Sequence, residues 1–588
     1  MGVAKLWPLL DEFSARKSVY ELTIASTNRP PHAFRLGIDV SLWFFHAEYG
    51  QEGENPELRT LFFRLELLLH NPIQPLFIFD GPGRPAWKRG KRINTWAQNP
   101  LTDGLKAFIE AFGFEWRMAP GEAEAELAYL NAAGIIDGVL TDDVDAFLFG
   151  AQTVWRNPSS THAQTSDTEK KNFVMVFQDV KLSRAELILI ALCAGGDYSP
   201  EGLPGCGPNT AKGLAHAGHA DRLYHVATTQ TREELLAYLP IWRAEVIQEL
   251  RTNSSGCLGH KHNRLANSVP ATFPDINILL AYTEPVTSPL ERYIDIDWMK
   301  KEPNVPAIAA LCEMYFEWGY KESVVKRFRT LIWPGLALRV LRRYIIEGEQ
   351  GKDEKYVWRK FAANEAVDVG EAGWMTKIHS TREHQSTGRA LQYRVEIDVS
   401  VPVRLAESGV QGWRRPTGAG PDAADFLQFE DRATDSAEDQ RGPLRVWLPA
   451  VMVQKARPAL VEEFEEMIRC RKEKKKPKGK KKVTEEMSGD DEPPTSPRKK
   501  KTAATPSATP RTPTKRKSKS ALPTKARRRG PEDDMVRKSP RKNKLDSPSR
   551  RLREGSPTRG KAKSKPIEVI VISSDDEGSD SDAMVFVG

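Results

Sequence analysis

Acidic residues recur at the ends of predicted strands in the first 214 residues of the chain. Short apolar runs alternate there with helix-like segments, and this alternation favours an α/β fold with a mostly parallel sheet flanked by helices. Asp39 ends the run LGID, Asp80 ends LFIFD, and Asp143 and Asp145 close VLTDDVD. Because the carboxyl ends of parallel strands line one crevice, we expect these four side chains to converge.

Three further carboxylates could reach the same crevice. Glu122 and Glu124 open a helix-like segment, and Asp197 follows two glycines. Residues i and i+2 of a regular helix point in nearly opposite directions. Glu122 and Glu124 can therefore share a site only at an irregular first turn, which the preceding Pro120-Gly121 permits.

This set of seven acids predicts a metal site. Side chains alternate along a strand, so Asp143 and Asp145 would share one face while Asp142 points away. Clustered carboxylates repel one another unless cations compensate them, and hard oxygen ligands suit Mg²⁺ or Mn²⁺. Two such ions about 3.5–4 Å apart can activate water and stabilise the leaving oxygen of a phosphodiester. An Asp-Gly turn or a DxD pair alone is usually structural, so the inference depends on the ordered set.

The basic residues concentrate at the C-terminal end of the 588-residue chain. From Arg471 to Gly588 there are 34 basic and 17 acidic residues, a net charge of +17, whereas the preceding 470 residues carry −9. Lys, Arg, Ser, Pro and Thr dominate this tail, so we expect it to be disordered. Clusters such as KEKKKPKGKKK and KARRR are typical of nuclear-import and DNA-binding segments, and a plain solvated linker is the alternative.

Other features of the sequence narrow the class of protein. Five irregularly spaced cysteines argue against a disulfide framework and fit a reducing compartment. No run of 18 apolar residues predicts a membrane-spanning helix, and the N-terminus lacks a signal-peptide pattern. We therefore expect a nuclear protein without a membrane partner. The segment CLGHKH lacks a second pair of zinc ligands and is not interpreted as a zinc site.

After residue 214, the first 470 residues of the chain divide into two further parts. After a Gly/Pro-rich turn, LPGCGPNTAKGL, helix-like segments continue to about Ile346. Between about Tyr356 and Cys470, the strand-like runs LQYRVEIDV and LRVWLPAVMV are separated by a Gly/Pro/Asp-rich insertion and followed by the helix-like PALVEEFEEMIRCR. This pattern predicts a small, separate β-rich module closed by a helix.

Six ordered segments resemble the signature blocks of the XPG/flap-endonuclease superfamily of structure-selective nucleases. They are MGVAKLW, IDVSLW, FDG, APGEAEAELAYL, TDDVDAFLFG and GGDYSPEGLPGCGPNTA. The DVSLW block, the β-rich module and the long basic tail most resemble the Gen-type Holliday-junction resolvases. The spacer of about 40 residues between FDG and APGEAEA excludes the XPG protein itself, and the tail shows no clamp-binding motif of the flap-endonuclease kind.

The resemblance implies a domain organisation. It places an XPG N-terminal region of a PIN-like nuclease core at 1–105 and the XPG internal region at 106–214. A helix–two-turn–helix and helical DNA-binding region would span 195–350, a chromodomain-like module 356–470, and a disordered basic regulatory tail 471–588. Whether the module contacts DNA or a histone mark is left open, and DNA contact or packing is favoured.

The resemblance also implies site residues. Two Mg²⁺ ions, with Mn²⁺ as a substitute, would be held by the catalytic carboxylates Asp39, Asp80, Glu122, Glu124, Asp143, Asp145 and Asp197. The implied DNA-binding residues are Gly2, Lys88, Arg89, Lys91, Arg92, Gly205, Gly207 and Lys212. Lys88 and Arg92 would share one face of a helix. The amine of Gly2 would lie near the active site if Met1 is removed, and K⁺ would bind at the helix–two-turn–helix.

Two features of the tail predict regulation. Ser496, Thr512, Ser539, Ser547 and Ser556 each precede Pro with a basic residue two or three positions further on, the pattern of proline-directed kinases. Five phosphates would cancel roughly 8–10 of the tail's positive charges. Ile567 to Asp582, a β-type run followed by acids, resembles a SUMO-interacting motif. An accidental apolar patch is the alternative for that run.

The carboxylate set and the resemblance together predict Mg²⁺-dependent, structure-selective DNA cleavage in recombination and repair. The expected substrate is a four-way junction, cut by a homodimer with paired symmetric nicks, and 5′ flaps would be cut as well. A monomeric 5′-flap endonuclease and a junction-binding scaffold without activity remain the alternatives.

Overall fold

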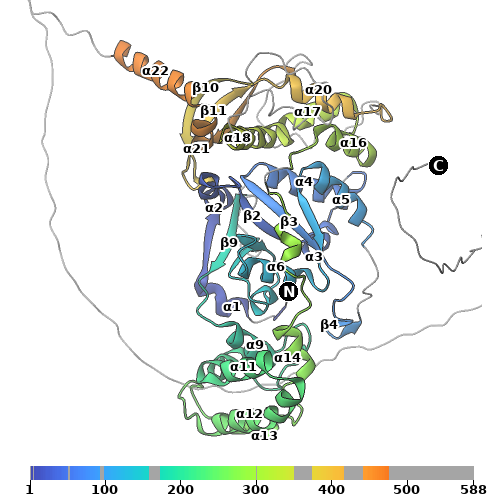
Figure 1. The fold of residues 1–588 in the computed structure, drawn as a ribbon, viewed down its shortest axis with the longest axis vertical. Coiled ribbons are helices and arrows are strands. Elements are labelled where there is room, and N and C mark those ends of the chain that lie inside the picture. The colour runs from blue at the N-terminus through green and yellow to red at the C-terminus, as the bar shows by residue number, and fades with distance from the viewer. Residues whose placement is uncertain are drawn as a thin grey trace, which may run out of the picture. The chain divides into compact units, whose positions relative to one another are not determined.

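The centre of the computed structural model is a seven-stranded sheet with the order β1-β9-β8-β7-β2-β3-β6 (Figure 1). The structure describes residues 2–3, 6–50, 53–92, 99–157, 172–298, 301–349, 374–415 and 441–475. Strands β8, β7, β2, β3 and β6 pair in parallel, and β9 joins β1 and β8 in antiparallel pairing. The strands are β1 (Ser14–Ser18), β2 (Phe34–Asp39), β3 (Ile73–Phe79), β6 (Glu115–Met118), β7 (Gly138–Leu140), β8 (Thr153–Arg156) and β9 (Phe173–Gln178). The predicted mostly parallel sheet is confirmed.

Strand β2 is the point at which the chain changes direction across the sheet. Ile38 of β2 pairs with Phe77 of β3 on one side and with Leu140 of β7 on the other. The chain builds β3 and β6 on the first side and returns to add β7 and β8 on the second. In open α/β sheets such a switch point opens a crevice at the carboxyl ends of the strands.

Helices cover both faces of the sheet because the central strands are apolar on both faces. In β3, every residue is buried; Phe77 packs into one apolar core and its neighbour Ile78 into the other. Helices α4 and α5 pack on the first face, and α6 and α9 on the second. The helices of this part are α1 (Trp7–Leu10), α2 (Val19–Ile24), α3 (Val40–Ala47), α4 (Pro56–Leu69), α5 (Thr102–Ala111), α6 (Ala123–Ala132), α7 (Asp145–Leu148) and α9 (Arg184–Ala194), with short 3₁₀ turns η1 (Asp11–Phe13) and η2 (Ala25–Asn28).

A helical region follows the sheet, as the sequence predicts. Capping boxes at Ser183 and Thr231 start α9 and α12, because each side chain accepts the backbone N–H of a glutamate three residues on. The elements are α10 (Pro208–Leu214), the π-helical turn η3 (Ala215–His219), α11 (Ala220–Thr229), α12 (Arg232–Thr252), α13 (Asn263–Ser268), α14 (Ile276–Thr283), α15 (Glu291–Ile294), α16 (Val305–Tyr315), α17 (Lys321–Leu331) and α18 (Trp333–Glu349). Among the described residues, no helix is both long and apolar enough to span a bilayer.

A three-stranded antiparallel sheet, β10-β11-β12, forms the predicted β-rich module. Its elements are β10 (Met375–Glu383), the 3₁₀ turn η4 (Gln385–Thr387), β11 (Leu391–Ile397), α20 (Ser400–Gly409), β12 (Leu444–Pro449), α21 (Ala450–Ala456) and α22 (Pro458–Lys475). The two predicted strand-like runs contain β11 and β12, and α22 is the predicted closing helix. The sequence did not predict β10 or α20, and the end of LRVWLPAVMV is helical rather than extended.

The module does not have a core of its own, contrary to the expectation of a separate unit. Buried Val395 and Trp374 belong to the same apolar core as Phe62 of α4 and Trp333 of α18. The carboxylate of Glu313 in α16 is also buried and accepts the backbone N–H groups of 411–413 at 2.6–2.7 Å. Helices α16 and α18 therefore present one face to the nuclease sheet and another to the module.

Candidate metal centre and nucleic-acid interface

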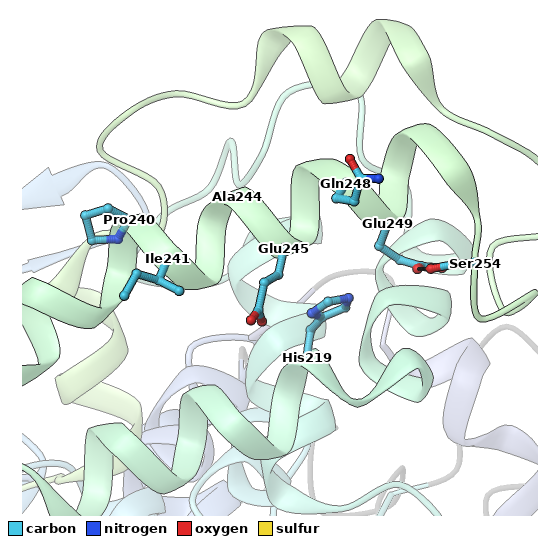
Figure 2. Close-up of a pocket in the computed structure, with 8 residues that line it drawn as sticks. All are labelled: His219, Pro240, Ile241, Ala244, Glu245, Gln248, Glu249 and Ser254. Carbon is cyan, nitrogen blue, oxygen red and sulfur yellow. Dashed lines mark hydrogen bonds between the residues drawn. The ribbon is translucent and has the colours of Figure 1, made fainter.

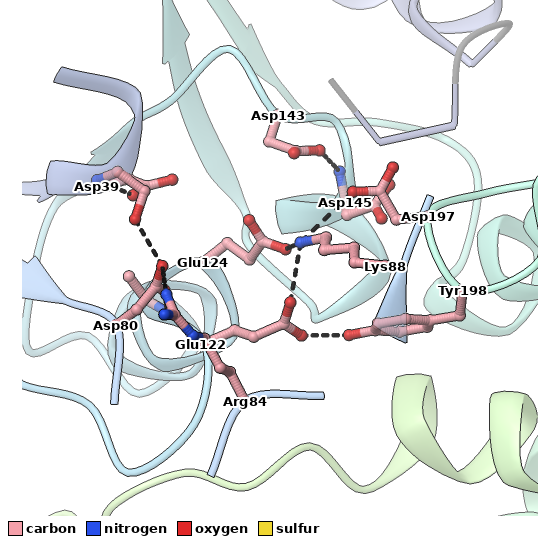
Figure 3. Close-up of polar contacts among 12 residues, drawn as sticks. Asp39, Asp80, Arg84, Lys88, Glu122, Glu124, Asp143, Asp145, Asp197 and Tyr198 are labelled. Atoms are coloured by element: carbon pink, nitrogen blue, oxygen red, sulfur yellow. Dashed lines mark hydrogen bonds and ion pairs between the residues drawn. The ribbon is translucent and has the colours of Figure 1, made fainter. Parts of the chain in front are cut away.

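Four neighbouring parallel strands each bring an acid to one edge of the sheet (Figure 3). Asp39 is the last residue of β2, Asp80 follows β3, and Glu122 follows β6 across a short turn. Asp143 and Asp145 follow β7. With Glu124 and Asp197, all seven predicted carboxylates lie in this carboxylate centre, and all except half-buried Asp80 are buried.

Ser41 connects two of these acids. Oδ1 of Asp39 accepts the backbone N–H of Ser41 at 2.9 Å and so caps α3. The Ser41 hydroxyl donates to Oδ2 of Asp80 at 2.6 Å, and Oδ1 of Asp80 accepts the N–H of Ala123 at 2.9 Å. Ser41 lies in the DVSLW block but was not among the predicted site residues.

Glu122 and Glu124 share the site because α6 begins irregularly, as expected. Glu122 is the N-cap residue with extended backbone (φ −84°, ψ 139°), and Glu124 lies in the first turn. Both accept hydrogen bonds from Nζ of Lys88, at 2.8 and 2.6 Å. The third glutamate of the same segment, Glu126, points away and binds the hydroxyl of Tyr293 at 2.5 Å.

Asp143 and Asp145 lie together because of a loop rather than a strand. β7 ends at Leu140, and Asp145 begins α7, with its backbone N–H on Oδ1 of Asp143 at 3.1 Å. Asp142 points away and accepts the N–H of Asn157 at 3.2 Å. The predicted division among these three acids is therefore correct, but strand alternation is not its cause.

Gly2 lies against the same pair of acids. The backbone N–H of Val3 donates to Oδ1 of Asp145 at 3.0 Å. Gly2 has a φ of +74°, and a Cβ added there would overlap carboxylate oxygens of both Asp143 and Asp145. Glycine is therefore required for this close approach of the N-terminal backbone to the carboxylate centre.

The predicted helix over WKRGKRI is wrong: the segment is a β-hairpin. Strands β4 (Trp87–Lys88) and β5 (Lys91–Arg92) pair across a turn at Arg89-Gly90, both with positive φ. Lys88 pairs with Lys91 and Trp87 with Arg92, so Lys88 and Arg92 do not share a face. Lys91 and Arg92 are exposed.

The other two basic residues of the hairpin reach the carboxylate centre. The Arg89 guanidinium binds both oxygens of Asp197, at 2.9 and 2.6 Å, and lies 3.3 Å from Asp143. Nζ of Lys88 lies 3.4 Å from Asp197 in addition to its glutamate contacts. Lys88 and Arg89 thus place two positive charges among the acids.

Burial and mutual repulsion change the protonation of the acids. Burial, with the charges of Asp80 and Asp143, raises the pKa of Asp39 to about 7. Burial also raises the pKa of Glu124, Asp143 and Asp145. For Asp197, burial acts in the same direction, but hydrogen bonds from Arg89 and the charge of Lys88 outweigh it and lower its pKa.

These properties fit divalent cations. No three acidic, histidine or cysteine side chains of the described residues are close enough together to hold an ion by themselves, and Lys88 lies between several of the acids. Mg²⁺ usually keeps several waters and takes only one or two carboxylates, so such close convergence is not required. Seven acids against Lys88, Arg89 and Arg84 leave an excess of negative charge that cations would neutralise.

The predicted phosphate-binding loop lies between α9 and α10. Gly205 has a φ of +85°, and Gly207 is the N-cap of α10 with open space where a side chain would be. Nζ of Lys212 lies 3.6 Å from Glu12. The backbone at Gly207 is therefore open to a phosphate, and Lys212 is paired with Glu12.

A pocket in the helical region does not belong to the carboxylate centre. It is lined by His219 and by α12 residues that include Ile241, Glu245 and Gln248 (Figure 2). None of the seven acids contributes to it.

Two protein-family models match parts of the chain. The XPG I-region family model matches residues 113–197, and the model of the Holliday junction resolvase Gen1 C-terminal domain matches 374–467. Both models describe nucleases of the XPG and Gen1 type, and the chain is similar to them over these two segments. The first model contains Glu122, Glu124, Asp143, Asp145 and Asp197, and the second contains the β-rich module up to the middle of α22.

Individual relatives agree with this Gen-type similarity. The human Flap endonuclease GEN homolog 1 is 32% identical over 234 residues, which are 36% of this chain and 24% of the relative. The match thus spans about a quarter of that relative's length. A crystal structure of the Holliday junction-resolving enzyme GEN1 with product DNA and Mg²⁺ is 27% identical, with a TM-score of 0.59, and covers 79% of this chain and 99% of its own. A GEN-1 structure binding potassium, also 27% identical with a TM-score of 0.59, covers 80% of this chain and 100% of its own.

Proposed function

We propose that the protein is a Mg²⁺-dependent, structure-selective DNA endonuclease. The observation that carries this proposal is the carboxylate centre, in which four adjacent parallel strands place acids at one switch point. The similarity to the GEN1 complex with product DNA and Mg²⁺ supports it. The seven carboxylates would hold two Mg²⁺ ions, or Mn²⁺ in their place. When bound, such ions supply an activated water and neutralise the leaving oxygen of a phosphodiester.

Lys88 and Arg89 are the side chains suited to orient the scissile phosphate. Both lie on one hairpin, both contact the acids, and Arg89 is nearly half exposed. A phosphate that reaches the centre would replace carboxylates as the binding partner of the Lys88 ammonium and Arg89 guanidinium groups. Arg89 can bind a phosphate through two N–H groups, whereas Lys88 acts as a point charge. The products would be a 5′-phosphate and a 3′-hydroxyl.

The proposed substrate is a four-way DNA junction, cut by two protomers with paired nicks, and 5′ flaps are a second substrate. The match of the C-terminal domain to Gen1 and the similarity to a junction-resolving enzyme support this choice. The loop around Gly205 and Gly207 would bind K⁺ and a phosphate of one DNA arm. The similarity to the potassium-binding GEN-1 structure supports the monovalent site.

A cruciform plasmid tests the substrate. We expect linear product in Mg²⁺, because both strands are cut within the lifetime of one complex. Single nicks with efficient flap cleavage would instead favour the monomeric flap endonuclease.

The double variant Asp39→Asn/Asp197→Asn should still bind junctions without cutting them, and Asp142→Asn, whose side chain points away from the centre, is the matched control. Cleavage by the double variant would overturn the metal assignment, and junction binding without cleavage by the unaltered protein would favour a scaffold.

We propose that the basic tail directs the protein to the nucleus and that phosphorylation weakens DNA binding or import. The basic clusters and the five proline-directed sites support this, and they lie outside the described residues. Localisation of the full chain and of a chain ending at Lys475 tests the first point. Equal DNA affinity and location for alanine and aspartate variants at all five sites would contradict the second.

We propose that Ile567–Asp582 binds SUMO by adding a strand to its sheet. The apolar run followed by acids supports this, and it also lies outside the described residues. Loss of SUMO binding on replacing the apolar residues 567–572 by alanine is the expected result, and unchanged binding would contradict it.

A further inference from the structure

Two tyrosines whose rings are in tilted contact lie beside the carboxylate centre and come from distant parts of the chain. The rings of Tyr198, which follows Asp197, and Tyr282, at the end of α14, have centroids 4.7 Å apart. The Tyr198 hydroxyl donates a short hydrogen bond to Oε2 of Glu122 (Figure 3). Glu122 is therefore held by Lys88 on one oxygen and by Tyr198 on the other.

The hydroxyl of Tyr282 is the unusual feature of this pair. Tyr282 is 1% exposed, and its hydroxyl has no hydrogen-bond partner among the described residues. A buried hydroxyl without a partner is costly, so its position calls for an explanation. Burial, and the charges of Asp145 and Asp197, raise the pKa of this phenol, so it remains a proton donor at neutral pH.

Gly196, the second of the two glycines before Asp197, accommodates this hydroxyl. Gly195 has a φ of +90°, which favours glycine. A Cβ at Gly196 would lie 2.7 Å from the Tyr282 hydroxyl and 3.1 Å from Cγ2 of Val3. Val3 in turn donates its N–H to Asp145. The Tyr282 hydroxyl thus lies against the backbone that carries Asp197 and beside the segment that holds Asp145.

The position of Tyr282 is fixed by other contacts. The guanidinium of Arg184 donates to its backbone carbonyl at 2.8 Å, and its ring lies 6.0 Å from that of Phe149. Asp275 caps the start of α14. The helical region therefore reaches the back of the carboxylate centre through one rigidly held side chain.

We propose that Tyr282 is a positioning residue of the metal centre. It supports the ring of Tyr198, which holds Glu122, and its own hydroxyl donates a hydrogen bond on the Asp145–Asp197 side when the acids are arranged around divalent ions. This inference rests on the proposed function, because it assigns divalent ions to the carboxylate centre. It gives α14 a role in the affinity for the ions rather than only in folding.

Mn²⁺ binding without DNA, measured by electron paramagnetic resonance, tests this role apart from catalysis. We expect Tyr282→Phe and Tyr198→Phe each to weaken Mn²⁺ binding by about five-fold, the worth of one neutral hydrogen bond. Tyr293→Phe is the matched control, because Tyr293 is equally buried and its hydroxyl binds Glu126 outside the centre. We expect that control to lose thermal stability but to keep Mn²⁺ affinity within about two-fold.

A second measurement separates positioning from a general structural effect. The Mg²⁺ concentration for half-maximal cleavage should rise by the same factor in Tyr282→Phe, while the rate at saturating Mg²⁺ changes little. Unchanged Mn²⁺ affinity in Tyr282→Phe, or an equal loss in Tyr293→Phe, would overturn the proposal. If the protein binds Mn²⁺ and Tyr282→Phe weakens that binding, but no branched DNA is cut, the proposed function fails and the role of Tyr282 stands.

Discussion

The carboxylate centre and a second cluster of buried charge on α18 differ in how their charges are balanced. The α18 cluster consists of Arg339, Arg342 and Arg343 with the acids Glu302 and Glu347. Its guanidinium groups donate to a carboxylate or to a backbone carbonyl, such as that of Ile73 or Pro31. Burial lowers the pKa of Arg339 to about 9 and that of Arg342 to about 10, so both stay charged at neutral pH.

The charge balance of the two clusters distinguishes a candidate functional site from a cluster that stabilises the fold. In the α18 cluster the two signs nearly cancel, and the arginines tie α18 to the sheet. In the carboxylate centre the acids outnumber their cations, and burial raises the pKa of several of them. A buried cluster that lacks counter-charge is costly unless a ligand supplies it. The unbalanced cluster is therefore the one that we expect to respond to metal ions.

The largest expected effect is on catalysis. Asp143→Asn should lower the cleavage rate by about a thousand-fold or more, because it removes a ligand of ions that contribute several kcal/mol to the transition state. The same change should not lower, and should slightly raise, the metal-free stability, since it removes a buried charge. Rates on a four-way junction and urea unfolding in a chelator measure the two effects. Retention of more than about a tenth of the rate would contradict the role of Asp143.

In the α18 cluster, loss of an acid is expected to lower the stability of the protein, with or without metal ions. Glu302 accepts hydrogen bonds from Arg343 at 2.9 and 2.5 Å, so Glu302→Gln removes one of the two acids that neutralise the buried arginines and leaves Glu347. The free energy of unfolding should fall by about 3–5 kcal/mol, with or without Mg²⁺. Glu466→Gln removes an exposed carboxylate from its pair with Arg469 and should change it by less than about 1 kcal/mol. If Mg²⁺ restored the stability of Glu302→Gln, the two clusters would not be independent.

The carboxylate centre could be predicted from the sequence, whereas the α18 cluster could not. Asp39, Asp80 and Asp143 could be predicted because each ends or follows a strand, and the carboxyl ends of parallel strands line one crevice. The α18 cluster and the role of Glu313 depend on contacts between segments far apart in the chain, such as Glu313 with Gly412. Local patterns carry no signal for such pairs, which explains why the shared core of the β-rich module was missed.

The hairpin shows a different reason for failure. The spacing of Lys88 and Arg92 fits a helix, but Arg89 and Gly90 both adopt positive φ and form a tight turn. Arg89 is held in that conformation by its contacts with Asp197, including its backbone N–H on the Asp197 carbonyl at 2.6 Å. Tertiary contacts thus override the local helical preference of the basic residues. Tyr198 and Ser41 lie beside predicted acids, and their hydroxyls were the available signal that was not used.

The pH dependence of stability tests the excess of acids in the carboxylate centre, and its expected effect is smaller. The pKa of Asp39 is about 7 in the folded chain and about 4 in an unfolded one, so the folded state binds more protons between these values. Without metal, the raised pKa of Asp39, together with the raised pKa values of Glu124, Asp143 and Asp145, should therefore lower the free energy of unfolding by about 3 kcal/mol or more from pH 4 to 7. The lowered pKa of Asp197 acts in the opposite sense, but only below about pH 4. Mg²⁺ should flatten the profile, measured by urea unfolding, and Asp39→Asn should make it less steep, because Glu124, Asp143 and Asp145 still titrate. A metal-free profile that rises over this window would contradict the excess of negative charge.

The smallest expected effect distinguishes two lysines of one hairpin. Lys88 and Lys91 are paired residues of β4 and β5, but only Lys88 is inserted among the acids. Lys88→Gln removes a cation that competes with divalent ions, so Mn²⁺ affinity without DNA should rise by about three-fold. Lys91→Gln should leave that affinity within about 1.5-fold, because its charge is exposed and screened. If Lys88→Gln instead weakened Mn²⁺ binding, the ammonium group would support the arrangement of the acids rather than stand in for a metal charge.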